Sequence, residues 1–291
     1  MKYVIKDNEA AFVSKNGCFE KMLTAGTYHF SRLLGYEVEI EEMAGEMDYL
    51  ETPYQVLARD DTFSASTIHR EIPDGSVGFI YVNGKLTSFA NRKEYTFWNV
   101  YDKYEIKVVS MEEVVMGTGI TKQMLSLIPG KYYTEVLVGE GETGLVYFDN
   151  ILQKPLPKGV YRFWNYRFSI TSLVIDMRQK ELDISGQEIL TKDKIGIRMN
   201  VACLYKIRDA VDFVTTVSDL KGQLYVAVQL AIREIVGNYK LDEILEGKER
   251  ISAELYGALK DREGMFCVNF LTAGIKDIIL PGEIREIMNS V

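Results

Sequence analysis

Apolar, aromatic and polar positions recur along the first 164 residues at an interval of 66 or 67 residues. Residues 72–98 align with residues 138–164 without a gap, and residues 5–30 align with residues 72–97. The two longer copies share glycine, leucine and aromatic positions: Gly75, Gly78, Tyr81, Leu86, Tyr95, Phe97 and Trp98 match Gly141, Gly144, Tyr147, Leu152, Tyr161, Phe163 and Trp164. Self-similarity at a fixed period indicates a repeated structural unit.

Each copy has the pattern of a small antiparallel β-unit. A short apolar strand, such as residues 77–82, runs into a two-residue turn: Asn16-Gly17, Asn83-Gly84 or Asp149-Asn150. These residue types accept positive φ at both central positions, as a type I′ hairpin turn requires. An aromatic strand follows (TYHF, EYTFW or VYRFW), and then a strand that alternates strictly, as in residues 36–41 and 104–109. Alternation predicts one face on a core and one in water.

Two segments join the copies, residues 44–66 and residues 112–131. Both are predicted to be irregular connectors, the second with a helix at residues 119–127 that ends before Pro129-Gly130. The recurring aromatic residues have two interpretations. They pack the core of each unit, or they form a groove of stacked rings like those that bind single-stranded nucleic acid.

The pattern changes from residue 132 onward. Strands are predicted first, at residues 135–138, 143–148, 169–176, 180–184 and 194–205, and a later one at residues 266–270 leads into IKDIIL.

Helices follow the strands. Asp209 is an N-cap candidate for a helix over AVDFVTTV, and Asp219 is one for a helix over residues 220–236 that Gly237 ends. The latter carries one apolar stripe, formed by Leu224, Val228, Ala231, Ile232 and Ile235. Residues 241–259 are predicted as a further helix, so the C-terminal module is α+β.

Five segments of this module resemble the bacterial slipins, stomatin relatives in the SPFH/band 7 (stomatin/prohibitin) superfamily. They are VGEGETGLVYFDNILQKPLPKGVYRFW (138–164), GQEILTKDKI (186–195), AIREIVG (231–237), LDEILEGKE (241–249) and GIKDIILPGEI (274–284). The resemblance covers about residues 131–291. It implies an SPFH domain with a mixed sheet and packed helices over residues 132–291. Two β-rich repeats of its opening β-unit precede it: repeat 1 (1–45) and repeat 2 (67–113), with linkers at 46–66 and 114–131. The first part of the SPFH domain is repeat 3.

The resemblance also implies a function. Proteins of this type are non-catalytic, oligomeric scaffolds that organise membrane-associated protein assemblies or microdomains. The implied partners are further copies of the chain and membrane proteins, such as an NfeD-like protein or a protease. Peripheral membrane contact and a cytoplasmic location at the inner face of the membrane are also implied. The alternative is a soluble adaptor that presents partners to a membrane protease through its N-terminal β-repeats.

The sequence departs from the family pattern at two places. Family members carry a hydrophobic hairpin or transmembrane helix before the domain, where this chain has two β-repeats. They also continue into a long charged helix that drives assembly, whereas this sequence stops at Val291. Either the natural protein is short or the natural chain is longer, and the end at this junction favours the longer chain. No run of 18 apolar residues occurs, so no transmembrane helix is expected within these 291 residues. Charges interrupt the first six residues, which excludes a secretory signal there.

The charge of the chain argues against nucleic acid as a partner. The net charge is −8, and residues 1–66 alone hold 6 basic and 12 acidic side chains. No segment is basic enough to neutralise many phosphates, so nucleic-acid binding is not expected. The acidic residues are densest at Glu37, Glu39, Glu41, Glu42, Glu46 and Asp48. They indicate either a solvated face that protects an edge strand or an acidic docking patch for a basic partner.

Candidate chemistry is sparse. The three cysteines, Cys18, Cys203 and Cys267, lack the spacing of a disulfide framework or a zinc cluster, and the last two lie in apolar runs that predict burial. His29 and His69 are expected to be ordinary strand or surface residues. The GxGxxG match at residues 139–144 precedes a strand, so it indicates a turn and not a dinucleotide site. The SxxK match at residues 218–221 lacks its partner motifs. We therefore predict no catalytic, cofactor or metal site, and no enzyme activity.

Overall fold

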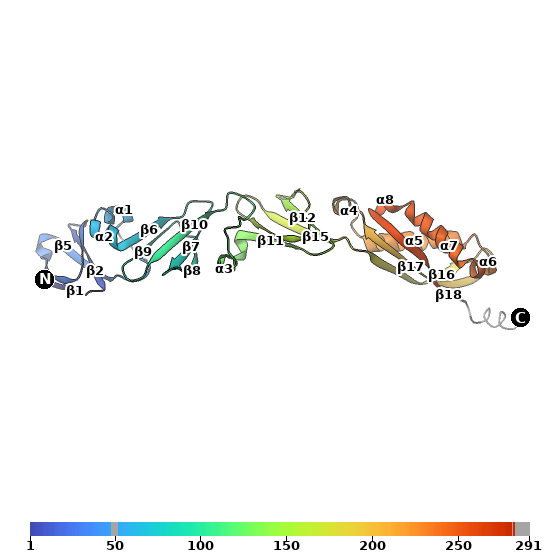
Figure 1. The fold of residues 1–291 in the computed structure, drawn as a ribbon, viewed down its shortest axis with the longest axis horizontal. Helices are drawn as coiled ribbons and strands as arrows, with labels where there is room; N and C mark the ends of the chain where they lie inside the picture. Colours follow the sequence, from blue (N-terminus) through green and yellow to red (C-terminus); the bar gives the residue numbers. More distant parts are fainter. Residues whose placement is uncertain (48–51, 281, 283–291) are drawn as a thin grey trace. The chain divides into compact units, whose positions relative to one another are not determined.

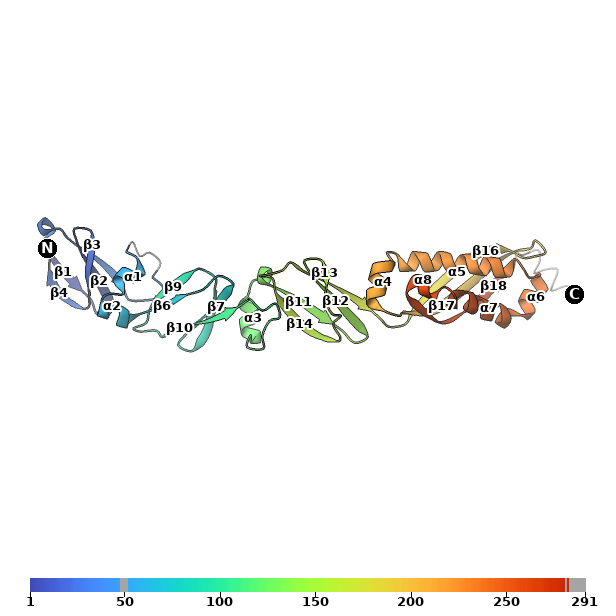
Figure 2. The same cartoon turned by 90° about the horizontal axis from the view of Figure 1, so that it is seen from above.

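The computed structural model describes residues 1–47, 52–280 and 282. The chain forms two compact units. Unit 1 comprises Met1–Thr134 and Arg162–Ser169, and unit 2 comprises Glu135–Tyr161 and Ile170–Val291. Figures 1 and 2 label the elements of each unit in two views.

The three repeats share one strand topology, which confirms the repetition predicted from the sequence. Repeat 1 comprises β1 (Lys2–Ile5), β2 (Glu9–Lys15), β3 (Cys18–Leu23), β4 (Gly26–His29) and β5 (Tyr36–Glu42). Repeat 2 comprises β6 (Thr67–Glu71), β7 (Ser76–Val82), β8 (Lys85–Ala90), β9 (Glu94–Trp98) and β10 (Tyr104–Ser110). Repeat 3 comprises β11 (Tyr133–Val138), β12 (Glu142–Phe148), β13 (Ile151–Leu152), β14 (Gly159–Trp164) and β15 (Ile170–Asp176).

In every repeat the second strand lies between the third and fifth strands of a three-stranded sheet, and the first strand pairs with the aromatic fourth strand. The hairpin turns have the predicted backbone. Asn16, Asn83 and Asp149 have φ of 51°, 50° and 47°, and the residues after them also have positive φ. These turns close the hairpins β2–β3, β7–β8 and β12–β13.

The helix predicted at residues 119–127 of the second connector is confirmed, whereas the first connector, predicted to be irregular, contributes two short helices to the core. The first holds α1 (Tyr54–Leu57) and α2 (Asp61–Ser66), and the second holds α3 (Lys122–Leu127). Phe63 on α2 and Met124 on α3 are buried. Asp60 caps α2 by accepting hydrogen bonds from the Thr62 and Phe63 amides. Its other oxygen accepts from the Met22 amide on β3 at 2.9 Å, which fixes the connector to the sheet.

Trp98 and Trp164 occupy the same position in repeats 2 and 3, and each packs into the core of the preceding repeat. Trp98 packs with Ala10, Met22 and Phe63, so it fills the core beneath the sheet of repeat 1. Trp164 belongs to unit 1 and packs with the equivalent strand of repeat 2 and with α3. Repeats 1 and 2 therefore each complete their core with a connector helix and with the tryptophan at the end of the next aromatic strand.

The remainder of unit 2 is α+β, as predicted. Strands β16 (Lys180–Leu190), β17 (Gly196–Ile207) and β18 (Val268–Ile279) form an antiparallel sheet in the order β16-β17-β18. The helices are α4 (Ala210–Thr216), α5 (Leu220–Val236), α6 (Leu241–Glu246), α7 (Lys248–Lys260) and α8 (Glu263–Phe266). Helix α5 packs on β16 and α7 packs on β18 (Figures 1 and 2). Their apolar faces share one core with the sheet.

The predicted N-caps are confirmed, and several predicted boundaries were wrong. The strand expected at 180–184 continues to Leu190. The Asp209 side chain accepts hydrogen bonds from two amides of α4, and the Asp219 side chain accepts one from the Gly222 amide. The helix expected over residues 241–259 is divided into α6 and α7, because Gly247 leaves helical geometry at φ −115° and ψ 34°. The strand expected at 266–270 begins at Val268, after Phe266 ends α8 and Cys267 adopts φ 53°, and it continues to Ile279.

Candidate functional site

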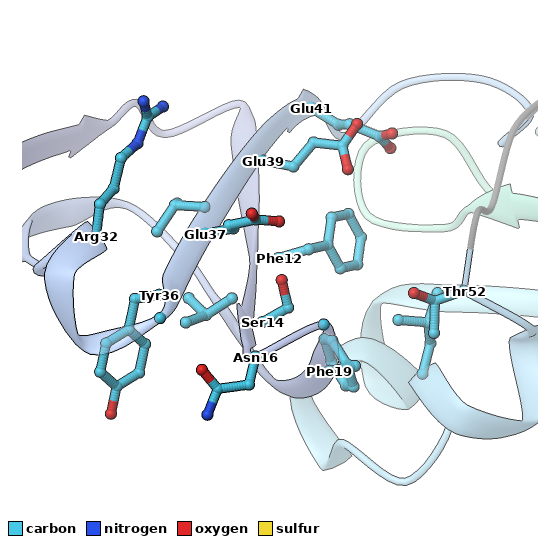
Figure 3. Close-up of a pocket in the computed structure, with 15 residues that line it drawn as sticks. Phe12, Ser14, Asn16, Phe19, Arg32, Tyr36, Glu37, Glu39, Glu41 and Thr52 are labelled. Atoms are coloured by element: carbon cyan, nitrogen blue, oxygen red, sulfur yellow. The ribbon is translucent and has the colours of Figure 1, made fainter.

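A groove with a volume of ≈ 850 Å³ lies on one face of the sheet of repeat 1 (Figure 3). Strand β2 contributes Phe12 and Ser14, and the start of β3 contributes Phe19. Strand β5 contributes Glu37, Glu39 and Glu41 along one wall, and residues of the first connector, Thr52 and Leu57, close one side. The groove therefore combines an aromatic floor with a row of carboxylates.

The strand register places the three glutamates on one face, as the alternation predicted. Glu39 lies opposite Phe12 and Glu37 lies opposite Ser14 on β2. Strand β5 is at the edge of its sheet, so the carboxylates line an edge strand. Two other acidic residues of the predicted patch have partners elsewhere: Glu42 accepts from Asn8, and Glu46 pairs with Arg92. Asp48 lies outside the described residues.

The electrostatics of the groove favour a cationic ligand. Burial, followed by the nearby charge of Glu39, raises the pKa of Glu41 above its ordinary value. The carboxylates of these two residues lie close to each other at one end of the groove (Figure 3). A bound cation would offset both the desolvation and the mutual repulsion of the pair. Arg32 is the basic residue among the described residues that line the groove.

The carboxylate row belongs to repeat 1 and is not required by the shared topology. The three positions of the row pair with the same positions of the central strand in every repeat. They are occupied by Glu37, Glu39 and Glu41 in repeat 1, by Glu105, Lys107 and Val109 in repeat 2, and by Thr171, Leu173 and Ile175 in repeat 3. Because the other two repeats form the same sheet without this row, the sheet does not require the glutamates.

An extended peptide with basic side chains matches this groove. The outer side of an edge strand presents backbone N–H and C=O groups that another strand can pair with, while side chains of the added strand enter adjacent pockets. Lysine or arginine side chains would meet the glutamates of β5, and their apolar stems would pack against Phe12 and Phe19. The arrangement of carboxylates and aromatic rings therefore suits the binding of such a peptide.

The candidate residues for chemistry lie on different elements. His29 is exposed on β4 and His69 is half-buried on β6. Burial raises the pKa of the Cys203 thiol to about 12, so this cysteine is protonated at neutral pH and is not a nucleophile. Ser218 is exposed before α5. In the GxGxxG segment, the Gly139 amide donates to the Glu142 carboxylate at 2.7 Å, so a carboxylate occupies the place that a phosphate would need.

The segment GQEILTKDKI forms a joint between the sheet and the helices of unit 2. Gly186, at φ 67°, lies in a β-bulge of β16, and the following Gln187 is buried and donates to the Tyr225 hydroxyl on α5 at 3.0 Å. At the other end of the segment, the Thr191 hydroxyl donates to Asp193 and lowers its pKa. Asp193 in turn accepts from the Leu241 amide at the start of α6. These polar residues hold the β16–β17 hairpin against both helices.

Comparisons with known proteins place similarity in the C-terminal part of the chain. Residues 136–291 match the SPFH domain / Band 7 family. An uncharacterised protein of Archaeoglobus fulgidus is 29% identical over 116 residues, which are 40% of this chain and 47% of that protein. A stomatin homologue of Pyrococcus horikoshii is 26% identical over 117 residues, 40% of this chain and 44% of the relative. Mouse stomatin-like protein 3 is 28% identical over 114 residues, 39% and 40% of the two chains.

The match therefore spans less than half the length of each of these three relatives. Within residues 1–47, 52–280 and 282, no helix has both the length and the apolar composition that crossing a bilayer requires.

Proposed function

The chain belongs to the SPFH domain / Band 7 family, and on that premise we propose that it is a non-catalytic scaffold that self-associates and organises membrane-associated protein assemblies. The observation that carries this proposal is the family match over residues 136–291, which covers the whole helical module and its sheet.

Helix α5 offers a surface for self-association. Its buried face packs on the sheet, but Val226 and Leu230, one turn apart, remain 51% and 55% exposed. Tyr225, beside them, is also exposed. Adjacent exposed apolar side chains on a surface helix are typical of a contact with another protein. We assign this surface, formed by Tyr225, Val226 and Leu230, to contacts between copies of the chain.

Light scattering at increasing protein concentration tests the scaffold proposal. We expect a mass well above the 33.2 kDa of one chain, because exposed apolar area is buried on association. A variant with Val226→Ser and Leu230→Ser should shift the distribution toward the single chain. The control is Arg233→Ser, at an exposed position of the same helix. A mass of one chain at all concentrations contradicts the proposal. If the double substitution leaves the mass unchanged, the α5 surface is not the contact between copies.

The acidic groove favours a second candidate function, a peptide-binding adaptor. Its test is titration of a labelled, extended peptide with alternating lysine and threonine residues. Replacing Glu37, Glu39 and Glu41 with glutamine should weaken binding about tenfold or more, because each lost charge pair removes a few tenths to one kcal/mol. Added salt should weaken binding to the unchanged chain in the same direction.

The matched control removes the same number of charges from exposed positions outside the groove: Asp74→Asn, Glu105→Gln and Glu113→Gln. Net charge then changes equally in both variants. Equal weakening in the two variants would show that binding follows net charge alone, which contradicts a specific groove.

A further inference from the structure

Three potential metal ligands converge on the two-stranded sheet of repeat 2. Strands β6 and β9 pair antiparallel, with His69 opposite Thr96 and Glu71 opposite Glu94. His69 and Glu71 are two residues apart on one strand, so they share a face with the paired Glu94. One donor atom from each of His69, Glu71 and Glu94 lies within 4.8 Å of the other two.

The imidazole of His69 is held in place from two sides. Its Nδ1 is 2.9 Å from the Thr96 hydroxyl oxygen, and Thr96 is buried. The ring stacks on Tyr54 of α1 with centroids 3.8 Å apart and planes inclined by 11°. When Nδ1–H donates to the Thr96 hydroxyl, the lone pair resides on Nε2, which lies 3.9 Å from a Glu94 carboxylate oxygen. A second hydrogen-bond partner on the ring nitrogen that faces away is the usual support of a metal-binding histidine.

The pairing of two glutamates also requires an explanation. Like charges directly opposite each other on an antiparallel pair destabilise the pair. At the same position of the β1–β4 pair, Val4 lies opposite Thr27, so the shared topology forms without carboxylates there. In repeat 3 the corresponding residues are Leu137 and Val160. The facing carboxylates are thus a feature of repeat 2, and a cation between them would convert repulsion into attraction.

We propose that His69, Glu71 and Glu94 bind one divalent transition-metal ion, with Zn²⁺ as the best chemical match. An imidazole nitrogen with two carboxylate oxygens is a donor set for Zn²⁺, whereas Ca²⁺ and Mg²⁺ prefer oxygen ligands alone. Bonds of about 2.0–2.2 Å place tetrahedral donors about 3.4 Å apart, so a small rotation of the exposed glutamates brings them into range. Water would complete the coordination. The bound ion joins β6 to β9 and stabilises repeat 2.

Calorimetric titration of the whole chain with ZnCl₂ tests the site. The parent protein carries Cys18→Ser, because the exposed Cys18 thiol is a competing zinc ligand. We expect one saturable site per chain, no comparable binding of CaCl₂ or MgCl₂, and a thermal midpoint that rises with zinc concentration. His69→Gln, Glu71→Gln and Glu94→Gln should each weaken binding at least about tenfold. Glu105→Gln, at an exposed position on β10, is the control and should bind as the parent does.

A further variant tests whether loss of zinc binding results from loss of folding. The pair Glu71→Val and Glu94→Thr copies the residues that repeat 1 carries at these positions, so it should fold and raise the thermal midpoint without metal, yet lose the zinc-dependent rise. The proposal is overturned if zinc binding is not saturable, if the glutamine variants bind like the parent, or if the Val/Thr pair retains the site. Calcium binding of equal strength overturns the assignment to a transition metal.

Discussion

Trp98→Ala is expected to destabilise unit 1 by about 3–5 kcal/mol, the loss typical of removing a buried tryptophan from a core. Trp98 is 3% exposed, and its ring lies 6.2 Å from the ring centroids of both Phe12 and Phe63. Its removal would leave a cavity between the sheet of repeat 1 and α2. Urea denaturation followed by tryptophan fluorescence measures the effect, because Trp164 then remains as the single tryptophan in the chain.

Two further substitutions serve as comparisons for Trp98→Ala. Trp98→Phe keeps part of the packed area and should lose less than Trp98→Ala. Tyr101→Ala removes an aromatic ring that is 59% exposed, so its effect should stay below about 1 kcal/mol. A Trp98→Ala variant no less stable than the Tyr101→Ala variant would contradict the packing described for this core.

The position of Trp98 also couples neighbouring repeats. It ends β9 of repeat 2 but fills a core built on β2 and β3 of repeat 1. Stability in repeat arrays is a sum of unit terms and nearest-neighbour interfaces. The fluorescence of Trp164, which packs on repeat 2, should therefore register the Trp98→Ala substitution although the two tryptophans lie in different cores.

Features encoded by a few adjacent residues were predictable from the sequence. The Asn-Gly turns and the caps Asp209 and Asp219 depend on local backbone preferences, and the structure confirms them. The predicted alternation of burial holds for the first four residues of β5 and fails at Ile40, which is exposed, and Glu41, which is half-buried. The strand that pairs with the aromatic strand could not be predicted in repeats 1 and 2. Strand β1 has only four residues, and β6 carries polar residues such as His69 and Glu71, so neither has a long apolar pattern that marks a strand.

The connectors illustrate a second limit. Phe63 is an isolated apolar residue in a polar segment, and the burial of Phe63 and Met124 depends on tryptophans 35 and 40 residues further along the chain. The carboxylate row of β5 was visible because its members alternate on one strand. The cluster of His69, Glu71 and Glu94 was missed because Glu94 comes from another strand, and only the β6–β9 register brings it opposite Glu71.

Leu255→Ala is expected to destabilise the helical module of unit 2 by about 2–5 kcal/mol. Leu255 lies on α7, is fully buried, and belongs to a core whose buried members run from Leu182 to Ile275, all within unit 2. The helices α4–α8 dominate the helical content of the described residues, so circular dichroism at 222 nm reports on this unit. Both tryptophans belong to unit 1, so their fluorescence reports on the other unit.

The substitution should therefore lower the urea midpoint seen by circular dichroism and leave the midpoint seen by tryptophan fluorescence unchanged. Trp98→Ala should produce the converse pattern, because the two cores share no buried residue. Leu190→Ala is the matched control. It truncates the same kind of side chain at a position that is 60% exposed, so the free energy of unfolding should fall by less than about 1 kcal/mol. Equal shifts of both midpoints would show that the two units unfold as one cooperative body. An unchanged circular dichroism midpoint would contradict the core assigned to α7.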